Sequence, residues 1–424
     1  MNSKNKRLIF SIWFFGLCFL PLQFSIAQST ISGSIAFGAP TRGGLDGKII
    51  RVTTLDATGP GSLGEAIEAK GPRIVVFEVG GVIDLNKAEM NITEPFLTIA
   101  GQTAPFPGIT LIKGGFWVNT HDIVIQHLRV RPGDAGEPKR SGWASDGLTT
   151  SGGNAYNIII DHCSFTWAVD ENLSASGRRT EGPDMTSHKI TFSNNIIAEG
   201  LDDSSHEKGP HSKGSLIHDF CRDIAIIGNL FAHNKMRNPY FKAYTTGVIA
   251  NNLIYNPGKT AIQLSYSPME WKNSGYKPQN CKVSIVGNVL YKGIDSSPSL
   301  AMVMNKGDAY MEDNLAYENN GLAAPLTAGE IVLLKKKPVW PDDFEPLSSE
   351  DVVDHIVNHA GARPRERDEI DQRIVMDFLN KKGKILDSQE EVGGYPTPTK
   401  TYRKLNIPED DIEGWLDLLA KKLE

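Results

Sequence analysis

The sequence predicts an all-β fold of the parallel β-helix class, on three observations. Residues 157–256 repeat one pattern, in which a short run rich in Ile and Val, a polar bend and a second short apolar run follow one another. The bends lie at His127, Cys163, Asn195, Asn229, Asn252 and Asn288. The separations between consecutive bends are 36, 32, 34, 23 and 36 residues. The intervals lack the helical patterns of roughly 10–15 residues that βαβ units would show. One β-helix coil needs roughly 20–25 residues, so loops of variable length explain the excess.

Asparagine at the bend has a physical reason. Its short polar side chain tolerates left-handed backbone and forms local hydrogen bonds. In stacked coils, asparagines at equivalent positions could also hydrogen-bond to one another along the stack. The repeats override the two or three domains that 424 residues would otherwise indicate, because a solenoid grows without adding separate cores.

The first 28 residues have the pattern of an export signal. A positively charged start is followed by the mostly apolar stretch 8–26 and by Ile26-Ala27-Gln28, which resembles a small-residue cleavage point. We therefore expect a secreted or periplasmic protein, with a membrane anchor as the alternative interpretation. No other run approaches the roughly 20 apolar residues of a spanning helix.

Residues 29–329 are expected to form the β-helix, which would carry the catalytic site. Near its start, Ser62 to Glu68 predicts a short helix capped by Ser62, with Glu65 at the capping-box position. Such a helix would close the open end of the solenoid, which would otherwise invite strand pairing with other chains.

Residues 330–424 are expected to be a tail packed on the β-helix, or alternatively an element that docks a partner. Within it, 330–347 is predicted as an extended segment, and helical apolar spacing marks 350–359, 365–381 and 412–423.

Composition and cysteine usage argue against several classes of protein and of binding site. Hydrophobic residues make up 40% and charged residues 22% of the chain, so a sizeable core is expected. The net charge of −6 argues against a nucleic-acid partner, whereas an acidic glycan needs only a local basic surface. Beyond the signal, Cys163, Cys221 and Cys281 are odd in number and widely spaced, which predicts neither a disulfide framework nor a zinc motif. Cys163 is expected to be buried.

The motifs resemble those of one family. D-G-L-T-T-S-G-G-N-A-Y-N-I-I-I-D-H-C-S-F-T-W at 146–167 is similar to the N-V-W-I-D-H-C-S-F-S signature, with its preceding aspartate, of the pectate lyases of polysaccharide lyase family 1. K-I-T-F-S-N-N-I-I and M-R-N-P-Y-F-K resemble two further segments of that family. The resemblance covers about Arg51 to Asn288 and implies a right-handed, single-stranded parallel β-helix. It also implies calcium-dependent β-elimination of polygalacturonate.

The resemblance assigns roles to individual residues. It makes Asp146 and Asp170 calcium ligands, Lys213 a binding residue for a substrate carboxylate, and Arg237 the catalytic arginine. Two positions depart from the family pattern. Ser174 stands where the family has a third calcium carboxylate, and Glu171 is the neighbour that would compensate. Lys242 replaces a second substrate-binding arginine, which keeps the charge but loses the bidentate fork.

The chemistry explains why these residue types would be needed. A uronate's C5 hydrogen lies α to a carboxylate and is poorly acidic, so its removal needs positive charge beside that carboxylate. Calcium and Lys213 would supply it. Arginine is a weak base because its ordinary pKa exceeds roughly 12, so Arg237 needs neighbouring cations to favour its neutral form. The alternative is that Arg237 only pairs with a substrate carboxylate.

Several other residues have two interpretations each. Asp161 and His162 are expected to hydrogen-bond within a coil rather than to catalyse. Asp202, Asp203 and His206 would suit a glycoside hydrolase, but neighbours on a strand face opposite ways. His211 and His218 either line the site or lie in a solvated loop, and Tyr240 and Trp167 either stack on sugars or pack in the protein.

Three functions therefore compete. The first is a calcium-dependent pectate lyase acting on acidic polysaccharide, expected to be a monomer. The second is a pectin lyase acting on methyl-esterified chains without calcium, against which Asp146 and Asp170 argue. The third is a non-catalytic β-helix that only binds glycan, against which the joint presence of Lys213 and Arg237 argues.

Overall fold

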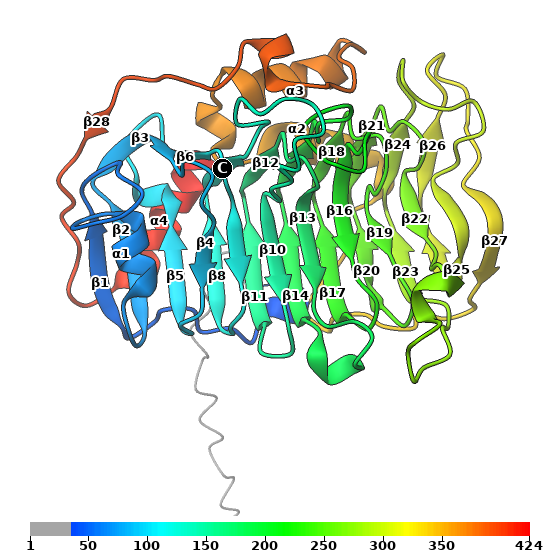
Figure 1. Cartoon of the computed structure of the whole chain (residues 1–424), viewed down its shortest axis with the longest axis horizontal. Helices are drawn as coiled ribbons and strands as arrows, with labels where there is room; N and C mark the ends of the chain where they lie inside the picture. The colour runs from blue at the N-terminus through cyan, green and yellow to red at the C-terminus, as the bar shows by residue number, and fades with distance from the viewer. Residues whose placement is uncertain (1–34) are drawn as a thin grey trace, which may run out of the picture.

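The computed structural model describes residues 35–424 and forms a right-handed parallel β-helix. Successive coils stack along the long axis, from β1 at one end to β27 at the other (Figure 1). The predicted export signal lies outside the described residues. Among residues 35–424, no helix is long and apolar enough to cross a membrane.

Each coil contributes strands to three faces of the solenoid. The first face contains β1 (Lys48–Val52), β2 (Arg73–Phe77), β5 (Leu97–Ala100), β8 (Ile123–Gln126), β11 (Tyr156–Asp161), β14 (His188–Ser193), β17 (Arg222–Ile227), β20 (Thr246–Ala250) and β23 (Lys282–Val286). The second face contains β4 (Met90–Ile92), β7 (Phe116–Val118), β10 (Leu148–Ser151), β13 (Glu171–Ser176), β16 (Lys213–Ile217), β19 (Tyr240–Phe241), β22 (Ile262–Leu264) and β27 (Thr327–Leu333). The long strand β25 (Val303–Glu312) pairs with β22 through its first residues and with β23 through its last.

The third face contains β3 (Val79–Asp84), β6 (Ile109–Ile112), β9 (Leu128–Arg131), β12 (Ser164–Thr166), β15 (Ile196–Ala198), β18 (Leu230–Ala232), β21 (Leu253–Tyr255), β24 (Val289–Tyr291) and β26 (Leu315–Tyr317). Within residues 35–424 the paired strands of successive coils are parallel, and β28 (Thr401–Tyr402) pairs antiparallel with β3. Short 3₁₀ helices are η1 (Ala36–Gly38), η2 (Gly101–Thr103), η3 (Pro183–Met185), η4 (Pro268–Trp271), η5 (Pro364–Glu366) and η6 (Gln389–Val392).

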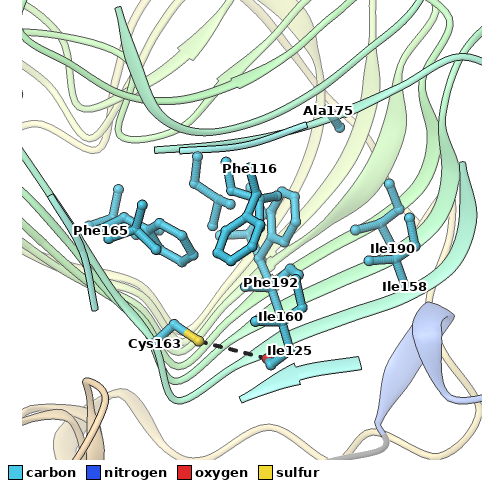
Figure 2. Close-up of a cluster of buried hydrophobic side chains, with 14 of the residues drawn as sticks. Phe116, Ile125, Ile158, Ile160, Cys163, Phe165, Ala175, Ile190 and Phe192 are labelled. Atoms are coloured by element: carbon cyan, nitrogen blue, oxygen red, sulfur yellow. Dashed lines mark hydrogen bonds between the residues drawn. The ribbon is translucent and has the colours of Figure 1, made fainter. Parts of the chain in front are cut away.

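The interior is filled by side chains that stack from coil to coil (Figure 2). Ile158 is in register with Ile123 on one side and with Ile190 on the other. This repetition is what the alternating apolar runs of the sequence predict, because every second strand residue faces inward. Cys163 belongs to this interior, with its Sγ 3.7 Å from the Ile125 carbonyl oxygen. Cys163 is buried, as expected, and Cys221 and Cys281 are buried as well; all three are free thiols in the described part of the chain.

The asparagine ladder is confirmed. The Asn229 Oδ1 accepts hydrogen bonds from Asn195 N (2.9 Å) and Asn195 Nδ2 (3.0 Å) of the preceding coil. The same pair of bonds recurs from Asn229 to Asn252, from Asn252 to Asn288 and from Asn288 to Asn314. Each buried amide is thereby satisfied along the stack.

Two details of the predicted alignment are wrong. The left-handed residue precedes the ladder asparagine, at Asn194, Gly228, Asn251, Gly287 and Asp313. His127 is aligned with His162, not with Cys163, since Arg129 pairs with Ser164 and the His127 N–H donates to the His162 carbonyl. The ladder also continues to Asn314, one coil beyond the predicted repeats.

The predicted capping helix is α1 (Leu63–Glu68), and its buried Leu63, Ala66 and Ile67 join the solenoid interior. Ser62 caps it by accepting a hydrogen bond from Glu65 N at 3.1 Å. The Glu65 carboxylate accepts from Gly61 N rather than from Ser62 N, so the reciprocal half of the capping box is displaced by one residue.

The tail runs back along the outside of the solenoid, from the β27 end toward the β1 end (Figure 1). It contains α2 (Ser349–His359), α3 (Glu369–Leu379) and α4 (Ile412–Leu423). Ile370, Ile374 and Phe378 of α3 are buried against third-face residues, as their spacing predicts. The strand β27 extends to Leu333, so the predicted start of the tail at 330 falls inside a strand. That strand is mostly exposed and therefore lacks a clear apolar pattern.

Candidate active site

Most of the predicted site residues gather at the start of the second-face strands. Glu171 begins β13 and is in register with Lys213, which begins β16. Lys213 in turn forms a β-bridge with Met236, the residue before Arg237. Parallel stacking in register thus brings side chains from successive coils together, although Glu171 and Lys213 are 42 residues apart in sequence and Lys213 and Arg237 are 24 apart.

Three carboxylates form the centre of the cluster. One oxygen each of Asp146, Asp170 and Glu171 lies within 4.8 Å of the others. Asp146 Oδ1 accepts a hydrogen bond from Glu171 N at 2.9 Å, and its Oδ2 accepts from the hydroxyls of Thr149 and Ser174. Ser174 therefore lies in the cluster as a hydroxyl donor, in register with Thr149.

The charges of this cluster repel one another. Burial, followed by the nearby Glu171 and Asp170 carboxylates, raises the pKa of Asp146 well above its ordinary value. Burial also raises the pKa of Glu171, even though the Arg237 guanidinium opposes the shift. A bound cation would relieve this repulsion.

Two cations lie against the carboxylates. Lys213 Nζ is 2.6 Å from Asp170 Oδ1 and 3.5 Å from Glu171 Oε1. The Arg237 guanidinium pairs with Glu171 and lies 5.5 Å from the centre of the Tyr240 ring. Burial disfavours ionisation of Asp170, but the Lys213 ammonium outweighs it and brings the pKa of Asp170 to about 2. The Arg237 side chain is 20% exposed, so solvent and solute can reach it.

Two histidines lie beside Asp170, and of these only His206 was not a candidate for this site. His206 Nε2 is 3.5 Å from Asp170 Oδ2, and His211 Nε2 is 3.9 Å from Asp170 Oδ1. Their rings stack with centroids 3.5 Å apart. The available signal was their spacing of five residues just before Lys213. Of the two interpretations of His211, the structure favours the one in which it lines the site. His206 lies next to Asp170 and does not act with Asp202 and Asp203 as a hydrolase would require.

Lys242 is not brought into the carboxylate cluster. Its buried Nζ lies 2.5 Å from Glu270 Oε2 and 3.4 Å from Asp219 Oδ2, and Arg179 shares both carboxylates. The charge of Lys242 is thus already paired within the chain. Burial, followed by the nearby cations Lys242, Arg179 and Arg237, lowers the pKa of His218 well below its ordinary value.

The remaining candidates have structural surroundings. The Asp161 carboxylate accepts from Ser193 Oγ and Asn194 Nδ2 and contacts His162 Nδ1, so the pair bonds within the coils as expected. Trp167 is fully buried and donates to Glu199.

The carboxylate pair expected of a hydrolase is also occupied. Asp202 pairs with Lys235, whereas Asp203 pairs with Lys139 and Arg140. These partners leave no free acid and base pair at 202–203.

The donor set at the cluster fits a hard divalent cation. Asp146, Asp170 and Glu171 offer oxygen ligands only, the type that calcium prefers. Their mutual repulsion, visible in the raised pKa of Asp146, is the electrostatic condition that favours binding of a cation. A cluster of this kind beside an ammonium and a guanidinium can hold an acidic ligand and stabilise negative charge that develops on it.

Comparisons with known proteins show what the whole chain is similar to. No family model matches the sequence. The chain is 30% identical over 413 residues to a protein named "Probable pectate lyase C" from Aspergillus oryzae, covering 93% of this chain and 89% of that one. A protein of the same name from Emericella nidulans is 29% identical over 416 residues, covering 94% and 88%.

Solved structures share the fold at low sequence identity. The major allergen jun a 1 from cedar pollen aligns with a TM-score of 0.57 at 17% identity, covering 77% of this chain and 92% of the allergen. A pectate lyase bound to a hexasaccharide aligns with a TM-score of 0.54 at 15% identity, covering 80% and 99%.

Proposed function

This chain belongs to the pectate lyases, which are polysaccharide lyases, and from that premise we propose that it cleaves α-1,4-linked polygalacturonate by calcium-dependent β-elimination. The observation that carries the proposal is the grouping of Asp146, Asp170 and Glu171 within 4.8 Å, with Lys213 and Arg237 against them. Acidic polysaccharide is the partner that such a mixture of carboxylates and cations suits, because the substrate brings its own carboxylates.

Asp146, Asp170 and Glu171 would hold the calcium ion, with Glu171 taking the place of the carboxylate that is absent at Ser174. When bound, calcium would withdraw negative charge from the uronate carboxylate and so acidify the C5–H bond. Ser174 and Thr149 keep Asp146 oriented through their hydroxyls. This second layer fixes the ligand, as outer hydrogen bonds do in metal sites generally.

Lys213 would bind the substrate carboxylate and stabilise the charge that develops as the C5 proton leaves. Arg237 would accept that proton in its neutral form, after its guanidinium has released a proton to solvent. The C5–H electron pair then forms the C4=C5 double bond, the C4–O bond breaks, and the leaving sugar oxygen takes a proton from solvent. The products would be one chain with a 4,5-unsaturated uronate at its new non-reducing end and one chain with a free anomeric hydroxyl at its new reducing end.

Glu171 would hold Arg237 in position, because the two side chains are paired. Lys242, which the resemblance makes a substrate-binding residue, would act on substrate only if its contacts with Asp219 and Glu270 rearranged. Lys213 is also paired, with Asp170 and Glu171, but it lies beside the carboxylates that would hold calcium, so we assign the main substrate contact to Lys213. The export-signal pattern of residues 1–28 supports a secreted or periplasmic enzyme.

The test is the ultraviolet absorbance of polygalacturonate, and separately of methyl-esterified pectin, incubated with the protein in calcium or in chelator. A calcium-dependent rise on polygalacturonate is expected, because elimination creates a conjugated double bond. A rise on esterified pectin that persists in chelator would instead identify a pectin lyase. Absence of a rise on both substrates would leave a glycan-binding β-helix.

Calcium affinity is expected to fall as pH is lowered, because a metal ligand must be deprotonated. Burial raises the pKa of Asp146 and of Glu171, so these two ligands are protonated at a higher pH than ordinary carboxylates, whereas Asp170, with a pKa of about 2, stays ionised. Isothermal titration calorimetry at several pH values, in two buffers of different ionisation enthalpy, would measure affinity and proton release together. An affinity that does not change with pH would contradict the prediction.

A further inference from the structure

Away from the carboxylate cluster, three side chains from distant parts of the chain meet at the end of α4. They are His127, His162 and Glu424, and one ligand atom of each lies within 4.8 Å of the others. His127 and His162 occupy equivalent left-handed corners of successive coils, and their rings stack at 5.3 Å with an interplanar angle of 13°. We propose that these three side chains bind a divalent transition metal of the zinc class.

The tautomer of His127 supports this proposal. His127 Nδ1 lies 2.7 Å from the Ala362 carbonyl oxygen, which can only accept, so Nδ1 carries the proton and Nε2 presents a lone pair. Nε2 is buried and has no hydrogen-bond partner in the part of the chain that the structure describes. A metal-ligating histidine typically donates its other N–H to a carbonyl or carboxylate in this way.

The spacing of the group suits ligands of one ion better than hydrogen bonds. Glu424 Oε1 is 3.9 Å from His127 Nε2 and 3.7 Å from His162 Nδ1. Both distances are too long for a hydrogen bond. The distance from Glu424 to His127 Nε2 is close to the separation of about 3.4 Å between two atoms bound tetrahedrally to zinc at roughly 2.1 Å, so a small inward movement would let both atoms bind one ion.

The surroundings supply further support. The Asp161 carboxylate accepts a hydrogen bond from His162 Nδ1 at 2.8 Å and is itself held by Ser193 and Asn194. Nδ1 therefore carries the proton, Nε2 is the atom of His162 left to bind a metal, and the carboxylate orients the ring. His359 of α2 lies within electrostatic range of both His162 and Glu424. Two imidazoles and one carboxylate form a donor set for zinc, cobalt or nickel, in contrast to the oxygen-only ligands at the candidate active site.

A metal here would connect the β-helix to its tail. His127 and His162 belong to the coils, Ala362 to the segment between α2 and α3, and Glu424 follows α4. The site would therefore stabilise the folded tail without taking part in elimination.

The test compares the full-length protein with Glu424→Gln, whose side chain is 25% exposed in the native protein and therefore tolerates the change. The probe is zinc alone, titrated into metal-free protein, with cobalt as a spectroscopic substitute. The native protein is expected to bind one more zinc ion than the variant, or to bind zinc at least about 100-fold more tightly. Residues that only hydrogen-bond to a metal ligand already contribute about 10–100-fold to metal affinity, and Glu424 would be a ligand itself. Zinc should also raise the thermal midpoint of the native protein more than that of the variant.

The matched control is Asp417→Asn, also on α4, whose carboxylate pairs with Lys421 at the surface. It should bind zinc like the native protein. Asp170, His206 and His211 also offer ligand atoms within 4.8 Å, so zinc bound there appears in all three proteins and cancels in the comparison. Equal stoichiometry and affinity in the native protein and in Glu424→Gln would overturn the proposal. Lyase activity, assayed in calcium, does not enter this comparison.

Discussion

Replacing Arg237 by lysine is expected to lower kcat on polygalacturonate by about 10²–10⁴-fold, the contribution typical of a positioned general base. Lysine keeps a positive charge that can pair with Glu171, but it presents no guanidinium at the position from which the C5 proton would be taken. Because the charge is retained, KM should change far less than kcat. Initial rates from ultraviolet absorbance, measured over a range of substrate concentrations in calcium, provide both constants.

The matched control for this variant is Arg178→Lys, an exposed arginine that pairs with Glu181, and it should retain native kinetics. If Arg237 only pairs with a substrate carboxylate, Arg237→Lys will raise KM and leave kcat within a few-fold of the native value. That result would remove Arg237 from the role of base while leaving the pectate lyase activity in place. Circular dichroism and the thermal midpoint would establish that both variants are folded.

Replacing Asp371 by asparagine is expected to destabilise the fold by about 3–5 kcal/mol, the usual cost of breaking a buried ion pair from one side. Asp371 is fully buried in α3 and accepts from Arg131 Nη2 at 2.8 Å, Arg129 Nε at 3.2 Å and Ser164 Oγ at 2.7 Å. Asp368, which caps α3, also pairs with Arg131, and after the cost of burial the two arginines hold its pKa far below the ordinary value. Loss of one carboxylate leaves two buried guanidinium groups with too little negative charge.

Urea denaturation followed by circular dichroism would measure this loss. Asp354→Asn, an exposed position on α2, is the control and should change stability by less than about 0.5 kcal/mol. A midpoint for Asp371→Asn equal to that of the control would show that the tail contributes little to the stability of the β-helix. A midpoint for Asp371→Asn well below that of the control would establish that α3 contributes to the stability of the whole fold.

Much of the fold was predictable because its signals are local and periodic. The alternation of inward apolar residues, the recurring asparagines and the Ser62 cap each depend on a few neighbouring residues, and α4 has the predicted bounds of Ile412 and Leu423. Errors appeared where one residue changes the register. His127 was aligned with Cys163, although it pairs with His162. The strand β27 was missed because an exposed terminal coil needs no apolar pattern.

The sequence by itself determined the solenoid, the family resemblance and most of the residues that gather around Asp146. The tertiary structure alone decided which charges meet. It places His206 and His211 beside Asp170, pairs Lys242 with Glu270, and places Glu424 near His127. The physical reason is that strand register follows from periodicity along the chain. The path of a loop or tail depends instead on burial and charge pairing with residues far away in sequence, for which no local pattern exists.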